Sequence, residues 1–230
     1  MAALGLVLVH SPLLGVFCWQ NVAVHLRAVG YDTIVPDFVP VLLKHPPFYP
    51  KIADVIAQAA DSLSGEIVLV GHSGAGALLP VVARAIGRKV RGALFVDAIL
   101  PHPRKTWFDT VPPDFAARVR ALSSNGFLRP WHEWWPLQVM AGLLPDDMER
   151  KNFAQKLERR PLAYFDEMAP DIELPALVQC RYLQLSPAYE VEAEMARGLG
   201  WSVDYCPLGH LAMLTDAINL GDRIQHAVRS

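Results

Sequence analysis

The sequence predicts an α/β fold with a mostly parallel sheet of about six strands and helices on both faces. Three observations predict it. Short apolar runs recur along the chain, segments with helical spacing lie between them, and a glycine follows most of the helical segments. Continuous apolar runs are typical of strands that are buried on both faces. Strands that alternate with helices imply right-handed crossovers, and hence a parallel sheet.

Each element is expected from its own pattern. The expected strands are the apolar runs at 4–9, 33–35, 67–70, 93–96, 182–185 and 202–205. The expected helices lie at 16–29, 52–63, 74–86, 190–199 and 217–228. The first four of these helices are followed by Gly30, Gly65, Gly87 and Gly200, and a glycine just past a helical pattern is a stop signal.

The alternation stops between Pro101 and about Pro175, where prolines are frequent and no convincing strand is visible. Helical pieces are expected there at 114–122, 131–143 and 146–159. We therefore predict a helical lid, residues 101–175, inserted into a core of residues 1–100 and 176–230. The lid holds four of the six tryptophans, at positions 107, 131, 134 and 135, which predicts a wall of an apolar pocket. The alternative for each ring is that it only docks the lid on the sheet.

Composition excludes several classes of protein. The chain has 230 residues, and its 52% hydrophobic content is typical of one soluble domain, with or without a modest insertion. The formal charge of −2, with no basic stripe, argues against nucleic acid and anionic membranes as partners. Three scattered cysteines argue against a disulfide framework and a structural zinc site. The apolar start, 2–9, is too short for a membrane span, so we expect a cytoplasmic protein.

The most informative motif runs from the strand at 67–70 into Gly71–His72–Ser73–Gly74–Ala75 and then a helix. A serine on such a turn has a strained backbone, and only small neighbours let the strand and the helix approach each other. Gly71 and Ala75 are those neighbours. The turn raises the hydroxyl above the sheet, where backbone N–H groups can stabilise an anion. The alternative interpretation is a serine that only caps a helix.

A nucleophilic serine needs a histidine to take its proton and an acid to orient that histidine. His210 is best placed, on the loop between the last strand and the terminal helix. Two acids compete. Asp97 ends the fourth strand beside the serine strand, whereas Glu190 follows the fifth strand but falls in the first turn of a helix, where a carboxylate simply complements the dipole. We favour Asp97 and keep Glu190 as the alternative.

With these motifs the chain resembles the α/β-hydrolase-fold proteins over nearly its whole length. Its layout is similar to the small plant methylesterase and hydroxynitrile lyase group, since it begins with the strand that leads to His10–Ser11 and carries Trp19. The segment 209–215, Gly-His-Leu-Ala-Met-Leu-Thr, resembles the histidine segment of the methylesterases. The resemblance implies that Ser73 is the nucleophile and His210 the base. It also implies that the Gly74 amide and the loop after the first strand bind the oxyanion.

That loop departs from the family pattern. Many relatives have His-Gly-x, in which x supplies an N–H group, but this chain has Pro12 at that place, and proline has none. The second oxyanion donor must therefore be the Ser11 hydroxyl or the Leu13 amide. Loss of one donor typically costs about 10²–10³ in rate, so a misplaced donor would make a slow enzyme.

We expect a serine hydrolase that cleaves a small or medium apolar carboxylic ester, thioester or lactone through an acyl-enzyme, with no metal or cofactor. Two alternatives stay open. One is a lyase or another non-hydrolytic enzyme, although Leu211 stands where the hydroxynitrile lyases have a lysine after the histidine, which argues against cyanohydrin cleavage. The other is a ligand-binding pseudo-hydrolase, motivated by Pro12. Neither the substrate nor the choice between monomer and homodimer follows from the sequence.

Overall fold

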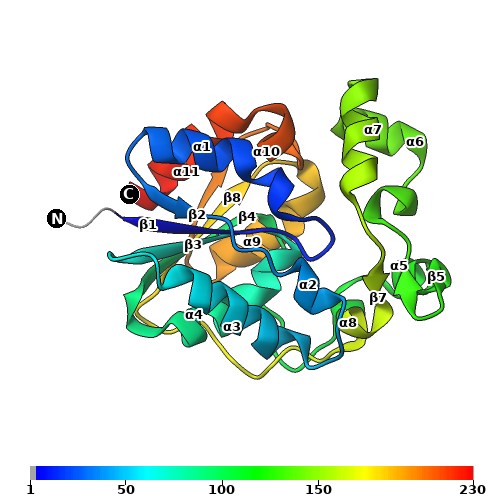
Figure 1. Cartoon of the computed structure of the whole chain (residues 1–230), viewed down its shortest axis with the longest axis horizontal. Helices are drawn as coiled ribbons and strands as arrows, with labels where there is room; N and C mark the ends of the chain where they lie inside the picture. The colour runs from blue at the N-terminus through cyan, green and yellow to red at the C-terminus, as the bar shows by residue number, and fades with distance from the viewer. Residues whose placement is uncertain (1–3, 230) are drawn as a thin grey trace.

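The core of the protein is a six-stranded parallel sheet, seen in a computed structural model that describes residues 4–229 (Figure 1). The strand order is β2-β1-β3-β4-β8-β9, and every neighbouring pair is parallel. The strands are β1 (Gly5–Val9), β2 (Asp32–Ile34), β3 (Ile67–Ser73), β4 (Val90–Ala98), β8 (Gln179–Gln184) and β9 (Ser202–Tyr205). The fold class predicted from the sequence is confirmed.

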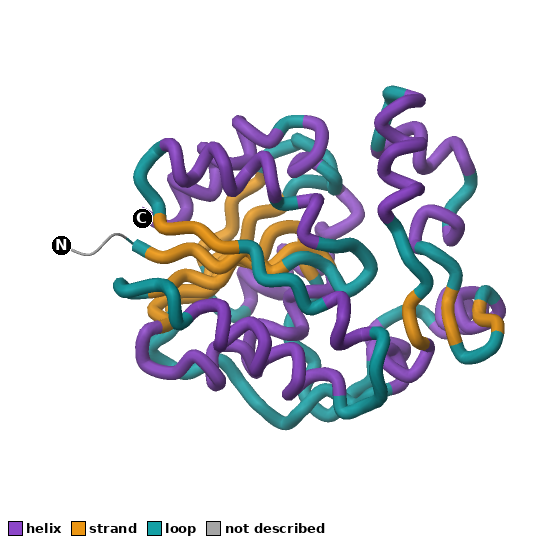
Figure 2. Tube along the Cα trace, in the orientation of Figure 1, coloured by secondary structure: helices purple, strands orange, loops and turns teal. Residues whose placement is uncertain are grey.

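Helices cover both faces of this sheet (Figure 2). On one face α1 packs against α11, and on the other α3 packs against α4, while α9 lies along β8 and β9. These helices are α1 (Gln20–Ala28), α3 (Phe48–Ala60), α4 (Leu79–Ile86), α9 (Glu190–Gly198) and α11 (Ala217–Arg229). Two single-turn helices, α2 (Val39–Leu42) and α10 (Ala212–Thr215), lie in the connections.

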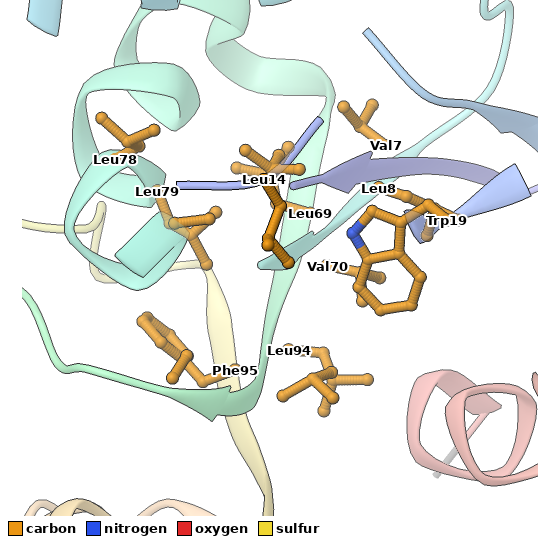
Figure 3. Close-up of a cluster of buried hydrophobic side chains, with 14 of the residues drawn as sticks. Val7, Leu8, Leu14, Trp19, Leu69, Val70, Leu78, Leu79, Leu94 and Phe95 are labelled. Atoms are coloured by element: carbon orange, nitrogen blue, oxygen red, sulfur yellow. The ribbon is translucent and has the colours of Figure 1, made fainter. Parts of the chain in front are cut away.

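The hydrophobic core lies between the sheet and its helices (Figure 3). Neighbouring residues of a strand point to opposite faces, so the apolar runs fill both layers. In Figure 3, Leu79 and Phe95 lie on one side of the strands, and Trp19, Val70 and Leu94 lie on the other. All of these side chains are fully or almost fully buried. The continuous apolar runs therefore reflect strands that are covered on both faces.

Most of the expected helix ends agree with the structure, with three exceptions. One is that the expected helix at 74–86 begins with a 3₁₀ turn, Gly74–Leu78, before α4. Gly30, Gly87 and Gly200 have φ of 97°, 79° and 78°, a left-handed conformation that favours glycine after a helix. The expected stop at Gly65 is wrong, because α3 begins earlier, at Phe48, and ends at Ala60. The expected helix at 16–29 is broken into a 3₁₀ turn, Val16–Cys18, followed by α1.

The segment between β4 and β8 contains several short helices, as expected. It contains the 3₁₀ turns Trp107–Thr110 and Trp131–Trp134, and the helices α5 (Pro113–Ala121), α6 (Leu137–Leu143), α7 (Asp147–Lys156) and α8 (Leu162–Asp166). The expectation that it holds no strand is wrong. A small antiparallel sheet joins β5 (Ser123–Ser124), β6 (Phe127–Leu128) and β7 (Arg160–Pro161). Strands of two residues are too short to give a periodic pattern in the sequence.

The predicted lid is tied to the core next to α8. The Glu167 carboxylate accepts hydrogen bonds from the backbone N–H of Phe48, at 2.7 and 2.9 Å, and from that of Tyr49, at 3.1 Å. Both amides belong to the first turn of α3, where N–H groups have no partner within the helix. A carboxylate there also complements the helix dipole. Glu167 of the predicted lid thus caps α3.

Candidate active site

Ser73 lies on the sharp turn that the sequence predicts, at the end of β3. Its φ of 55° and ψ of −125° are strained for a residue with a side chain. The turn is crowded on the helix side: a Cβ on Gly71 would lie 2.9 Å from the Leu79 side chain, and one on Gly76 would overlap the carbonyl oxygen of Ile99. Gly76, which the sequence reading did not single out, is therefore the tightest small residue of the turn.

Asp97 is the extra residue of a β-bulge at the end of β4. His72 pairs with Val96, and Ser73 pairs with Ala98, so Asp97 has no partner in the ladder. Its φ of 42° is also in the left-handed region. A bulge turns a side chain away from the direction that the strand would give it. The carboxylate of Asp97 is fully buried.

The structure brings Asp97 and His210 together. His210 Nδ1 donates to Asp97 Oδ2 at 3.0 Å, and both side chains are buried. The carboxylate also accepts from the backbone N–H of Leu185 at 2.7 Å, and from the N–H and Oγ–H of Ser186 at 3.0 and 2.6 Å. Glu190, the alternative acid, is exposed at the first position of α9. Asp97 therefore has the position that a histidine-orienting acid needs.

A second histidine holds the backbone of His210. His72 Nε2 donates to the carbonyl oxygen of His210 at 3.0 Å. Burial lowers the pKa of His72 well below its usual value, and the neighbouring His210 lowers it further. His72 is therefore neutral at pH 7. Its ring fixes the loop that carries His210.

Tyr189 is a site residue that the sequence reading missed. Its hydroxyl is hydrogen-bonded to Ser73 Oγ at 3.2 Å. Its ring stacks on the ring of His210, with centroids 5.0 Å apart and planes 11° apart. Tyr189 ends the 3₁₀ turn that follows β8, at the same edge of the sheet as Ser73 and Asp97. The position of Tyr189 just after a strand could have identified it from the sequence, because the carboxyl ends of parallel strands lie at one edge of the sheet.

The loop after β1 lies against the serine turn. A Cβ on Gly74 would lie 3.3 Å from Pro12 Cδ and 3.5 Å from Ser11 Oγ. The backbone N–H of Leu13 donates to Ser11 Oγ at 3.3 Å. Because that contact occupies the Leu13 amide and uses an acceptor site of the hydroxyl, the hydrogen of the Ser11 hydroxyl remains to be donated. Of the two donors considered, the geometry favours Ser11.

Two further side chains hold this loop. His10 Nδ1 donates to the carbonyl oxygen of Ser11 at 2.8 Å, and burial lowers the pKa of His10 to about 4, which keeps it neutral at pH 7. Arg160, from β7 of the predicted lid, donates through Nε to the carbonyl of Pro12 at 2.7 Å and through a terminal N–H to that of Leu14 at 2.6 Å. Arg160 is only 2% exposed, and this burial lowers its pKa. The lid thus supplies a buried cation that fixes the proposed oxyanion loop.

A small pocket opens beside Ser11 and Gly74. The space between its walls is about 290 Å³, with the open solvent at its mouth included. Its wall is mostly apolar and aromatic, and it is formed by Ser11, Pro12, Leu13, Tyr49, Gly74, Ala77, Ile99, His102, Trp107, Tyr164 and Phe165. The lining therefore comes from the core and from the predicted lid together.

The four lid tryptophans have different positions. Trp107 lines the pocket and packs edge-on against Phe165. The ring centroid of Trp131 lies 6.1 Å from that of His210. Trp134 donates its indole N–H to the carbonyl of Arg129. Trp135 stacks on Phe115, within the lid. Trp107 faces the pocket, whereas Trp134 and Trp135 pack the lid.

Two other features bear on the kind of site. Within residues 4–229, no three His, Cys, Asp or Glu side chains are grouped as the ligands of one metal ion would be. The same part of the chain holds no helix that is long and apolar enough to cross a membrane.

Comparison with known proteins gives three kinds of similarity. The family model described as the alpha/beta hydrolase family matches residues 6–219. A carbendazim-hydrolysing esterase from Nocardioides sp. (strain SG-4G) is 27% identical over 127 residues, which cover 53% of this chain and 52% of that protein. The match thus spans about half the length of this relative.

Solved structures are similar over almost the whole chain. A pyrethroid hydrolase from Sphingobium faniae JZ-2 has a TM-score of 0.77 at 19% identity, over 97% of this chain and 96% of that one. An extracellular alpha/beta-hydrolase from a Paenibacillus species, described as a homologue of tobacco salicylic acid binding protein 2, has a TM-score of 0.74 at 17% identity. That match covers 97% of this chain and 98% of the other. At these identities the likeness shows a shared fold.

Proposed function

Since this chain belongs to the alpha/beta hydrolase family and is a hydrolase, we propose that it cleaves apolar carboxylic esters through an acyl-enzyme on Ser73. The observation that carries the proposal is the Asp97–His210 hydrogen bond of 3.0 Å at the sheet edge where the strained Ser73 turn lies. A related protein named as a carbendazim-hydrolysing esterase supports ester hydrolysis.

In the proposed acylation step, His210 Nε2 takes the proton of Ser73 Oγ while Oγ attacks the ester carbonyl carbon. Asp97 holds the Nδ1–H of His210, which leaves Nε2 free as the base and stabilises the imidazolium that forms. His210 then gives the proton to the alcohol oxygen as its bond to carbon breaks. Water repeats the sequence on the acyl-enzyme and releases the acid.

The oxyanion of each tetrahedral intermediate is bound, in this proposal, by the Gly74 amide and the Ser11 hydroxyl. Two donors that are already in place cost no reorganisation during the reaction. His10 and Arg160 support this arrangement because they hold the carbonyl groups on either side of Pro12. In this proposal the Ser11 hydroxyl therefore replaces the backbone N–H that Pro12 lacks.

The pocket supports the choice of substrate. Its wall next to Gly74 is mostly apolar, and an aromatic ring, Trp107, is among its lining residues. Burial of an apolar acyl group contributes about 25 cal/mol per Å² of area removed from water. We therefore infer a small or medium apolar acyl group, in an ester or in a chemically similar thioester or lactone.

The test is turnover of p-nitrophenyl esters by the wild type and by Ser73→Ala. We expect the substitution to lower kcat by at least about 10³, because it removes covalent catalysis and leaves only the oxyanion donors. Thermal unfolding of the two proteins should be similar, which controls for loss of the fold. Near-full activity of the variant would show that Ser73 is not the nucleophile. A wild type that binds esters without turning them over would support a binding protein instead.

A further inference from the structure

The Tyr189 hydroxyl has a position that the proposed triad does not explain. It lies 3.2 Å from Ser73 Oγ, the atom that forms and breaks the bond to the acyl group. The Tyr189 ring at the same time covers one face of the His210 imidazole. A tyrosine that only packed against His210 would not need its hydroxyl at the serine.

Either hydroxyl could donate in this contact, and we assign its hydrogen to the phenol. Burial raises the pKa of Tyr189 far above its usual value, and the Asp97 and Glu192 carboxylates raise it further. Tyr189 therefore keeps its proton at any pH at which the enzyme works. The serine hydrogen is the one that the base must take, so we assign the phenol as the donor in this contact. With Tyr189 donating to Ser73 Oγ, the serine hydrogen is free to point toward the base.

The segment that carries Tyr189 is held by the same carboxylate that orients His210. Asp97 accepts hydrogen bonds from the backbone of Leu185 and Ser186 and from the Ser186 hydroxyl, at 2.6–3.0 Å. The 3₁₀ turn that ends at Tyr189 starts directly after these residues. One buried acid thus orients His210 and holds the segment that carries Tyr189.

We propose that Tyr189 is a further catalytic residue, a neutral donor that stabilises Ser73 Oγ as the leaving group when the acyl-enzyme breaks down. The proposal rests on the proposed function, because it takes Ser73 as the acylated residue. In that step water gives a proton to His210 Nε2 and forms a bond to the acyl carbon. The bond between the acyl carbon and Oγ then breaks, and its electron pair goes to Oγ. Oγ takes the proton from His210 Nε2, while Tyr189 keeps its own proton and donates a hydrogen bond to the charge that develops.

The effect should fall mainly on deacylation. In the free enzyme the phenol already donates to the serine hydroxyl, so the contact stabilises the starting state of acylation about as much as its transition state. In the acyl-enzyme Oγ is an ester oxygen, which is a weak acceptor, and the bond strengthens only as Oγ leaves. Only interactions that are stronger in the transition state than in the ground state accelerate a step.

The experiment measures the two steps separately for Tyr189→Phe, with stopped-flow release of p-nitrophenol for acylation and intact mass for decay of the acyl-enzyme. We expect deacylation to slow by about 10-fold, the cost of one hydrogen bond to a charged group, while acylation stays within about 3-fold. Tyr189→Leu, which also removes the ring from His210, should slow both steps. Tyr205→Phe, at an exposed tyrosine of β9, is the matched control and should leave both rates unchanged.

Three results would overturn this role. If Tyr189→Phe deacylates at the wild-type rate, the hydroxyl has no role in that step. If both steps slow equally, Tyr189 only supports the structure of the site. If turnover becomes faster, the hydroxyl inhibits the serine. Failure of the proposed function looks different, because the wild type would then form no acyl-enzyme or Ser73→Ala would stay active.

Discussion

The sheet core and the segment at 101–175 are held together in different ways. The core is built from apolar runs that are buried on both faces, and its central strands, β1, β3, β4 and β8, pair over five to seven residues. The other segment has strands of two residues and short helices packed through aromatic rings. Its polar ties to the core include Arg160, which binds the loop after β1, and Glu167, which caps α3.

Because of this difference, the two regions have different roles in the proposed site: the core positions the catalytic groups, and the segment at 101–175 helps to shape the pocket. Ser73 and Asp97 lie at the ends of core strands, where pairing between β3 and β4 fixes their spacing, and His210 lies on the loop after β9. The wall of the pocket is shared with the other segment, and Trp107 and Phe165 come from it. We therefore expect changes in the core to affect the chemical step or the stability, and changes in the lid to affect substrate preference. Arg160 is the exception, because it joins the two.

The largest effect is expected in the core, for Asp97→Asn. The amide lets His210 adopt the wrong tautomer, so kcat should fall by up to about 10⁴. Glu190→Gln is the matched control and should have a mild effect, since Glu190 is exposed on α9. Steady-state kinetics of both variants decide the matter. Two mild results would mean that another carboxylate, or none, orients His210.

Asp97 also shows which features of the site can be predicted from the sequence and which cannot. A carboxylate at the end of an apolar strand, next to the strand of a Gly-x-Ser turn, was enough to predict an acid near His210. The bulge that turns the side chain depends on pairing between β3 and β4, and no local pattern encodes it. Tyr189 and Arg160 were missed for the same reason, because each acts on a residue more than 100 positions away.

The next prediction compares the stability of two glycine variants, one at Gly76 in the core and one at Gly142 in α6. Gly76→Ala places a Cβ against the backbone of Ile99, which cannot move away cheaply, so the free energy of unfolding should fall by about 3 kcal/mol. Gly142→Ala, in α6, meets open space and should raise it by about 0.5–1 kcal/mol, because alanine favours a helix. Urea denaturation of both variants is the measurement. Equal effects would mean that the two regions are packed alike.

A smaller effect is expected where the two regions meet. Arg160→Met removes the donors to the carbonyls of Pro12 and Leu14, and kcat should fall by about 10-fold with KM little changed, since an oxyanion donor acts in the transition state. Arg159→Met is the control, because Arg159 is exposed and its contacts, with the carbonyls of Ser124 and Phe127 and with the Phe127 ring, lie in the small sheet. If Arg160→Met lowers the unfolding temperature and leaves kcat unchanged, the loop does not depend on it.

The smallest effect concerns the lid tryptophans. Trp107→Ala should raise KM about 5-fold for an ester with an aromatic or branched acyl group and leave KM for an acetyl ester unchanged, because only the bulky group contacts the ring. Trp135→Ala should lower thermal stability alone, since Trp135 stacks within the lid. Equal kcat/KM for bulky and acetyl esters in the wild type, with only stability lost in the variants, would make all four rings packing residues.

The most direct test of the central claim is to locate the nucleophile chemically. The wild type and Ser73→Ala are treated with a fluorophosphonate, and the adduct is mapped by proteolysis and mass spectrometry. A strained Ser73 served by the Asp97–His210 pair predicts one adduct per chain, on the peptide that contains Ser73, and none in the variant. An adduct on another residue, or an unlabelled wild type, would contradict the account.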